Sequence, residues 1–78
     1  MYIRKQVQNT IDSVKRYYED NIITETDYKE LTDKLLSFNF QHRGYSRYDF
    51  TYHFIFWCKW NIYDVIEEKR AKHLSTDN

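Results

Sequence analysis

The strongest constraint on the fold of this chain is its lack of residues that interrupt helices. It has no proline and a single glycine, Gly44, in 78 residues. Proteins built from β-sheets need frequent turns, and proline and glycine supply most of them. The sequence also contains no internal repeat, low-complexity tract or linker. We therefore expect a single helical domain over residues 1–78.

The first half of the chain has the pattern of a helical hairpin. A first helix is expected over about residues 2–20, because apolar residues recur there at three- and four-residue spacing. These residues are Ile3, Val7, Ile11, Val14 and Tyr18. Asn21 follows, and asparagine tolerates the left-handed conformation that often ends a helix. Thr24 and Asp27 then predict the capped start of a second helix, over about residues 25–38.

The same start signal returns once, at Ser46 and Asp49, with Tyr45 and Phe50 as the apolar pair that flanks the cap. Nothing interrupts the pattern after it, so we predict one long helix over about residues 47–73, roughly 40 Å in length. The expected fold is an all-α, three-helix domain, in which the capped αα-hairpin packs on this long C-terminal helix. The open alternative is a strand over residues 48–60, since Tyr, Phe, Thr, Ile and Trp favour sheets.

A turn asparagine, an Ile-Thr pair, an aromatic residue and a closing Leu-Leu pair follow one another within residues 14–36. They are Asn21, Ile23, Thr24, Tyr28, Leu35 and Leu36. This arrangement resembles the SHOCT domain, a short helical hairpin that commonly has glycine at the position of Asn21. The resemblance implies a hairpin for oligomerisation or binding, with no enzymatic role.

Charge and cysteine content restrict the class of protein. Twelve Lys and Arg balance twelve Asp and Glu, so nothing draws the whole molecule toward nucleic acid or anionic lipid. The apolar run over residues 54–58 ends at Lys59 and is too short to span a bilayer. Cys58 is the single cysteine, and with no signal peptide it indicates a reducing, cytoplasmic location without membrane attachment. The abundant Asn, Ile, Lys and Tyr are typical of A/T-rich genomes, such as those of low-GC bacteria, their phages and mobile elements.

We find no pattern for catalysis, for a cofactor or for a metal. One glycine cannot build a glycine-rich phosphate loop, and no two histidines have the spacing of a helical metal site. Ser46, His42 and Asp49 have the residue types of a catalytic triad, but helix capping already explains Ser46 and Asp49. Cys58 is expected to be a buried apolar residue. We expect no catalytic, cofactor-binding or metal-binding residues, and no enzyme.

The segment between the second and third helices is a first candidate site. It interleaves basic and aromatic side chains, which are His42, Arg43, Tyr45, Arg47 and Tyr48. Tyrosine and arginine are enriched in the centres of protein interfaces, and the same mixture suits phosphates and stacked bases. Three interpretations stay open: a solvated loop, a protein-binding site and a nucleic-acid-binding site.

The long helix has more apolar surface than a hairpin can cover. At about 100° per residue, one stripe should face the hairpin: Thr51, Phe54, Ile55, Cys58, Ile62, Val65 and Ile66. Another group should face away from it or flank it, and we predict that this group mediates self-association: His53, Phe56, Trp57 and Trp60.

These patterns predict a small, non-catalytic module that acts by stoichiometric association with a protein. An adaptor, or a phage-type inhibitor of a host protein, fits this size, with a homodimer formed through the long helix. The alternative is a small nucleic-acid-binding regulator that uses residues 42–48.

Overall fold

The computed structural model describes residues 2–75, with side chains described through residue 72. It has five helical segments: α1 (Lys5–Glu19), α2 (Glu25–Gln41), α3 (Arg47–Cys58), the π-helical segment η1 (Lys59–Tyr63) and α4 (Asp64–Ser75). The backbone stays helical at Lys59 and at Asp64, so α3, η1 and α4 form one continuous helix. Within residues 2–75 the chain thus forms three helices and no strand.

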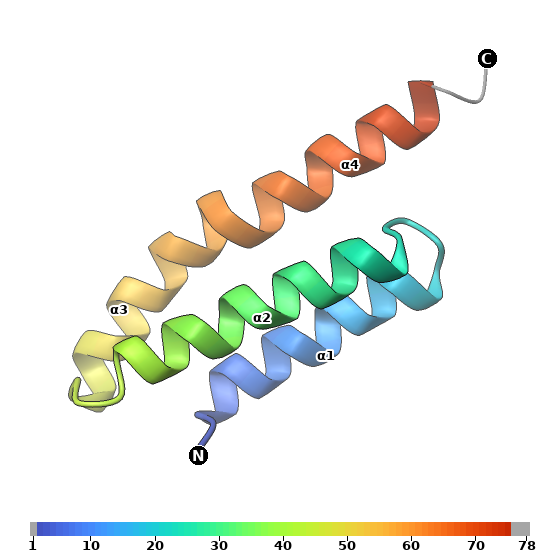
Figure 1. The fold of residues 1–78 in the computed structure, drawn as a ribbon. Helices are drawn as coiled ribbons and strands as arrows, with labels where there is room; N and C mark the ends of the chain where they lie inside the picture. The colour runs from blue at the N-terminus through green and yellow to red at the C-terminus, as the bar shows by residue number, and fades with distance from the viewer. Residues whose placement is uncertain (1, 76–78) are drawn as a thin grey trace.

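The predicted all-α, three-helix fold is confirmed, and the strand alternative for residues 48–60 was wrong. In Figure 1, α1 and α2 run antiparallel, and the long helix returns obliquely along α2. Its α4 end extends past the α1–α2 turn, which gives the molecule extents of 48 × 21 × 15 Å. Some ends differ from prediction: α1 begins at Lys5 rather than near residue 2, and α2 continues to Gln41 rather than ending near Phe38.

Local hydrogen bonds explain the turn between α1 and α2. Asn21 adopts a positive φ of 61°, and its N–H donates to the carbonyl of Tyr18 (3.0 Å), while that of Ile22 donates to Tyr17 (2.9 Å). This pair of bonds is the Schellman ending of a helix. The hydroxyl of Thr24 then accepts from the backbone N–H of Asp27, whose carboxylate accepts from the N–H of Thr24, both at 3.1 Å. The predicted helix ending at Asn21 and the capping box are both confirmed.

The predicted start of the long helix is also confirmed at its N-cap. The hydroxyl of Ser46 accepts a hydrogen bond of 3.2 Å from the backbone N–H of Asp49. The ring of Tyr45 packs against the rings of His42 and His53, at centroid distances of 4.8 and 5.4 Å. The loop is therefore tied to both helices that it joins.

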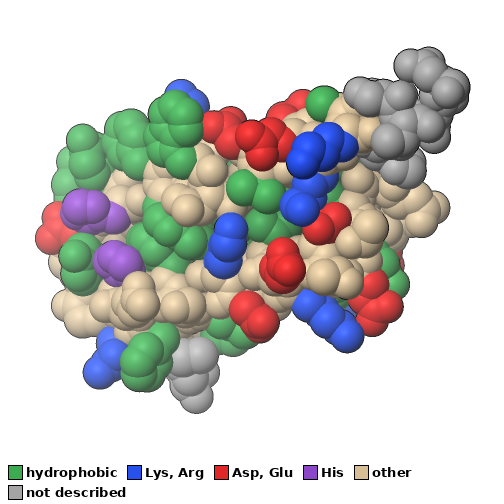
Figure 2. Space-filling view, turned by 45° about the horizontal axis from the view of Figure 1, so that its top comes forward, with side chains coloured by type: hydrophobic (Ala, Val, Ile, Leu, Met, Phe, Trp, Pro, Cys, Tyr) green, Lys and Arg blue, Asp and Glu red, His purple; other side chains and the backbone are tan. Residues whose placement is uncertain are grey.

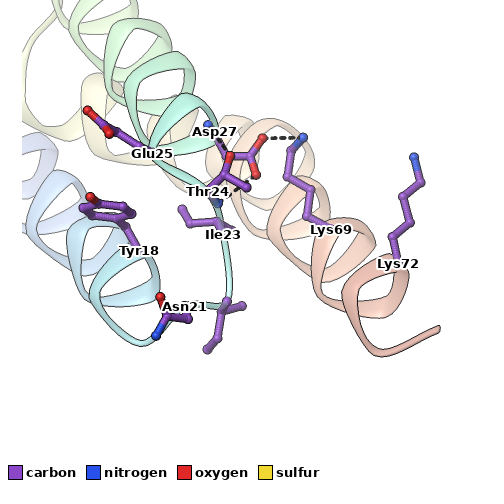
Figure 3. Close-up of a pocket in the computed structure, with 9 residues that line it drawn as sticks. Tyr18, Asn21, Ile23, Thr24, Glu25, Asp27, Lys69 and Lys72 are labelled. Atoms are coloured by element: carbon purple, nitrogen blue, oxygen red, sulfur yellow. Dashed lines mark hydrogen bonds and ion pairs between the residues drawn. The ribbon is translucent and has the colours of Figure 1, made fainter. Parts of the chain in front are cut away.

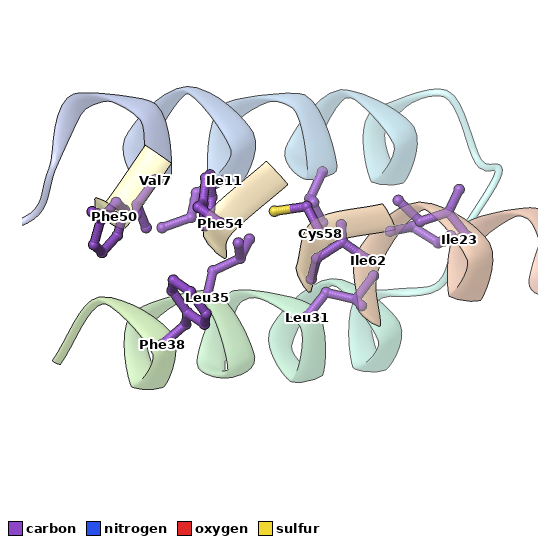
Figure 4. Packing of buried hydrophobic residues seen from close by; sticks show 12 residues of the cluster. Val7, Ile11, Ile23, Leu31, Leu35, Phe38, Phe50, Phe54, Cys58 and Ile62 are labelled. Atoms are coloured by element: carbon purple, nitrogen blue, oxygen red, sulfur yellow. The ribbon is translucent and has the colours of Figure 1, made fainter. Parts of the chain in front are cut away.

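The core lies where the long helix meets the hairpin (Figure 4). α1 contributes Val7, Ile11 and Val14, and α2 contributes Leu31, Leu35 and Phe38. Four residues of the long helix lie between these two rows, Phe50, Phe54, Cys58 and Ile62. Ile66 belongs to the same buried cluster. The ring of Phe38 lies 5.5 Å from both Phe50 and Phe54, which joins the α2 row to the long helix.

The π-helical segment keeps both halves of the long helix on the hairpin. The five buried residues of the long helix are each four positions apart. Four residues of α-helix turn about 400°, so each buried residue would lie about 40° further around the helix than the one before it. Between Cys58 and Ile66 the N–H of Asp64 bonds to the carbonyl of Lys59, five residues back. Such a turn takes up one extra residue and so winds the stripe back by about 100°. Ile62 and Ile66 therefore stay buried at 0% and 1% exposure.

This geometry corrects the predicted core stripe. Ile55 was expected to face the hairpin, but it is 62% exposed. The buried line follows the four-residue spacing from Phe50 through Phe54, and Ile55 lies about 100° to one side of it. Thr51 and Val65 are half-buried at the margin, and Phe50, which was expected to flank the cap, is a core residue with 0% exposure.

Gly44 provides a test of the loop. Its φ is not positive, and an added Cβ would meet no atom within 4 Å. Gly44→Ala should therefore raise the free energy of unfolding by about 0.5–1 kcal/mol, because it restricts the unfolded chain without straining the folded one. Asn21→Ala should lower the free energy of unfolding by roughly 1 kcal/mol, because residue 21 adopts the left-handed conformation, which alanine disfavours. Urea denaturation of both variants measures the difference, and a destabilised Gly44→Ala protein would contradict the loop geometry.

Candidate functional site

Five large apolar side chains lie exposed on the outer side of α3 and at the start of η1. They are Tyr48, Tyr52, Ile55, Phe56 and Trp60, with exposures of 80%, 57%, 62%, 54% and 64%. We call this group the aromatic face. In Figure 2, hydrophobic side chains gather at the upper left, over α3, while acidic and basic side chains predominate over α4.

The aromatic face is exposed because the hairpin covers one side of the long helix only. Phe50 and Phe54 point into that contact, so residues about half a turn away from them face solvent. The rings of Tyr52 and Phe56 contact each other edge-on, with centroids 5.2 Å apart. The ammonium group of Lys59 lies 5.1 Å from the centroid of the Trp60 ring. These contacts hold part of the face in a defined arrangement while leaving its outer surface open.

The four residues predicted for self-association do not all lie on this face. Phe56 and Trp60 do, and exposed His53 lies at its edge, where its ring contacts those of Tyr45 and Tyr52. Trp57 is half-buried, and its ring lies 4.6 Å from that of Phe38 on α2. Trp57 therefore flanks the intramolecular core, which agrees with the predicted position beside the stripe that faces the hairpin.

Two members of the aromatic face were missed in the sequence. Ile55 had been assigned to the core, and Tyr52 had been given no role. A signal for Tyr52 was present, because Tyr48, Tyr52, Phe56 and Trp60 are each four residues apart. This outer row runs parallel to the buried row that starts at Phe50.

The predicted partner-binding loop is held mainly by contacts within the chain. His42 stacks on Phe38 at 3.9 Å, and its Nδ1 lies 2.9 Å from the carbonyl oxygen of Phe38, which accepts a hydrogen bond when this nitrogen is protonated. Arg43 donates to the carbonyl of Phe40 (2.9 Å) and lies over that ring at 4.3 Å. These two side chains close the last turn of α2.

The remaining loop residues divide between contact and exposure. The carbonyl of Tyr45 accepts a hydrogen bond of 2.6 Å from the guanidinium of Arg4, which also lies 4.2 Å from the centroid of the Phe50 ring. The sequence did not indicate this role of Arg4. Arg47 and Tyr48 are exposed, and Tyr48 belongs to the aromatic face. The loop and the aromatic face therefore adjoin at the start of α3.

A hollow of about 570 Å³ separates the α1–α2 turn from α4, and its lining includes Asp27, Lys69 and Lys72. Figure 3 shows Lys69 directed at Asp27, with 2.8 Å between their charged atoms. Burial alone would raise the pKa of Asp27, but hydrogen bonds from Lys69 and Thr24 outweigh it and hold this pKa below its usual value. The hydrogen bond to Asp27 raises the pKa of Lys69. This pair joins the projecting α4 to the hairpin, so its role is structural.

The Asp27–Lys69 pair makes the stability depend on acid pH. A carboxyl whose pKa is lowered by folding stabilises the protein above its unfolded pKa of about 4, and this contribution is lost as the pH falls through the lower folded pKa. Asp27→Asn should cost about 1 kcal/mol at pH 7, because Lys69 is partly exposed, and less at pH 2. Asp33→Asn, at an exposed position on α2, is the control. Thermal melts at the two pH values test this, and an equal loss at both would exclude the ion pair as its cause.

Cys58 lies in the core with 4% exposure, and burial raises the pKa of its thiol to about 12. It is therefore a neutral apolar group at physiological pH. Within the part of the chain that the structure describes, no three metal-ligating side chains come together. Among residues 2–75, no helix has both the length and the apolar character needed to cross a bilayer.

Similarity to known proteins adds no assignment to this geometry. No protein-family model, curated protein or solved structure matches the chain. The resemblance of residues 14–36 to a SHOCT hairpin stays a prediction.

Proposed function

We propose that this chain acts by stoichiometric binding to protein, without catalysis or a cofactor, and that it self-associates through the aromatic face. The observation that carries the proposal is the presence of five large apolar side chains, each more than half exposed, on one side of α3 and the start of η1. Contiguous apolar patches on soluble monomers are usually small, and larger ones mark interaction sites.

The energetics of this face favour a covering partner. Complete burial of a large apolar side chain contributes roughly 1.5–3 kcal/mol. Each residue of the aromatic face is about half exposed or more, so covering it would contribute about half of this free energy. Small domains have only about 5–15 kcal/mol of total stability. Covering the face with protein therefore stabilises the folded chain appreciably as well as forming a complex.

The composition of the face supports a protein as the partner. Tryptophan and tyrosine are enriched among residues that dominate binding energy, and the five residues of the face carry no charge, with Lys59 placed beside Trp60. A protein of this size with such a face would work as an adaptor or as a phage-type inhibitor of a host protein in the cytoplasm. A homodimer is the simplest arrangement, because twofold pairs are the commonest protein assemblies.

The alternative, a nucleic-acid-binding regulator, depends on the basic loop. Arg43 is engaged with Phe40, and nearby Arg4 is engaged with Tyr45 and Phe50. A phosphate would have to compete with these contacts for Arg43 and Arg4. The aromatic face therefore supports protein binding better than the loop supports nucleic-acid binding.

The proposal predicts a dimer of the wild-type chain in sedimentation at micromolar concentration. Trp60→Glu should give a monomer that keeps its helical circular dichroism spectrum, because the substitution places a charge within the interface but outside the core. Tyr2→Glu is the matched control, since Tyr2 is an aromatic residue with 80% exposure that does not belong to the aromatic face. A wild-type protein that stays monomeric across the concentration range would contradict self-association.

A second measurement addresses the alternative. Titration of labelled single-stranded and duplex oligonucleotides should show no specific binding at about 150 mM salt. Phosphate contacts would show themselves as an affinity that falls steeply between about 50 and 200 mM salt. Such binding, together with its loss in the double variant Arg43→Ala/Arg47→Ala, would favour the nucleic-acid function instead.

A further inference from the structure

Two opposite charges flank the middle of the aromatic face. Asp49 lies in the first turn of α3, and Lys59 is the first residue of η1. Both are exposed. The midline of the face runs along the helix midway between the directions of Tyr52 and Phe56. At about 100° per residue, Asp49 lies about 40° to one side of this midline and Lys59 about 40° to the other. Of these two flanking charges, the acidic one therefore lies toward the N-terminal end of the face and the basic one toward its C-terminal end.

This distribution of charge distinguishes between the two ways in which two copies can pair. In a parallel pair, Asp49 would meet Asp49 of the second copy, and Lys59 would meet Lys59. In an antiparallel pair whose twofold axis passes level with Phe54, Asp49 of each copy lies level with Lys59 of the other. Like charges placed opposite each other are unfavourable, so the antiparallel pair is preferred.

The same antiparallel register also matches the apolar residues. It places Tyr52 level with Phe56 of the second copy and Tyr48 level with Trp60. Residues on opposite sides of the midline lie side by side across a seam between antiparallel helices, as in knobs-into-holes packing. One placement of the axis therefore sets rings level with rings and acid level with base.

We propose that the aromatic face is covered by a second copy of this chain, antiparallel along α3, with Asp49 of each copy beside Lys59 of the other. This arrangement rests on the self-association proposed above and specifies its orientation and register. The twofold axis duplicates every contact, so each dimer contains two Asp49–Lys59 pairs and each substitution acts twice.

Charge reversal tests the register. Asp49→Lys or Lys59→Glu replaces two attractive pairs by two repulsive ones. Each substitution should raise the Kd of dimerisation by at least about tenfold. The double variant Asp49→Lys/Lys59→Glu should restore the Kd to within about threefold of wild type, since it exchanges the charges without changing their pairing. An equimolar mixture of the two single variants should form heterodimers for the same reason. Sedimentation equilibrium measures each Kd.

Controls separate charge pairing from folding. Lys34→Glu and Asp33→Lys reverse charges at exposed positions on α2 and should leave the Kd unchanged. Asp49→Lys also places a cation at a helix N-terminus, which is unfavourable, so its thermal melt is compared with that of Lys59→Glu. The latter lies within the continuous helix and has no such effect. A loss of dimer in Lys59→Glu reports the interface itself when the melting temperature is unchanged at concentrations low enough to keep both proteins monomeric.

The possible outcomes separate the register from the proposed function. If Trp60→Glu abolishes the dimer while single charge reversals have no effect, the face self-associates in another register and the antiparallel arrangement is wrong. If single reversals weaken the dimer and the double variant fails to restore it, the Asp49–Lys59 pairing is also wrong. If the wild-type chain is monomeric at every concentration, the proposed self-association and the register both fail.

Discussion

The packing of one long helix across a short hairpin depends on the four-residue spacing of its buried side chains. A regular α-helix would carry Ile66 about 160° away from Phe50, and the far half of the long helix would lose its contact with α2. The π-type hydrogen bond from Asp64 to Lys59 corrects most of this drift. It also lies where the outer row of apolar residues reaches its last member, Trp60. The buried row continues to Ile66, and half of the residues of α4, beyond Trp60, are charged.

The end of the molecule that carries the aromatic face is held by buried polar contacts. Asn39 is 2% exposed; its side chain accepts a hydrogen bond from the N–H of Arg4 (3.0 Å) and donates one to the carbonyl of Tyr2 (2.8 Å). Arg4 in turn reaches Tyr45 and Phe50 at the start of α3. A satisfied network of this kind rigidifies the elements that it joins. Tyr48 and Tyr52 are therefore presented from a helix whose start is fixed against both helices of the hairpin.

The parts of this fold that the sequence predicted are those decided by residues close together in the chain. The helix ending at Asn21 and the caps at Thr24 and Ser46 depend on bonds spanning at most five residues. The position of Ile55 was predicted wrongly because a uniform 100° per residue takes no account of the π turn. The engagement of Arg43 with Phe40 is local but depends on how α2 ends, and the side chain of Asn39 bonds that end of α2 to the N-terminal segment. Contacts of that range leave no periodic signal.

The aromatic face contributes little to the intramolecular fold, and this bears on why it is apolar. None of its five residues belongs to the buried cluster, and the four-residue spacing of the core places them where the hairpin does not reach. Charged or amide side chains at these positions would keep the helix and increase its solubility. The same helix does have charged residues after Trp60, including Asp64, Glu67 and Glu68, so the chain is not apolar throughout its outer surface. The exposed apolar row from Tyr48 to Trp60 therefore fits the proposed role of this face as a surface that another protein covers.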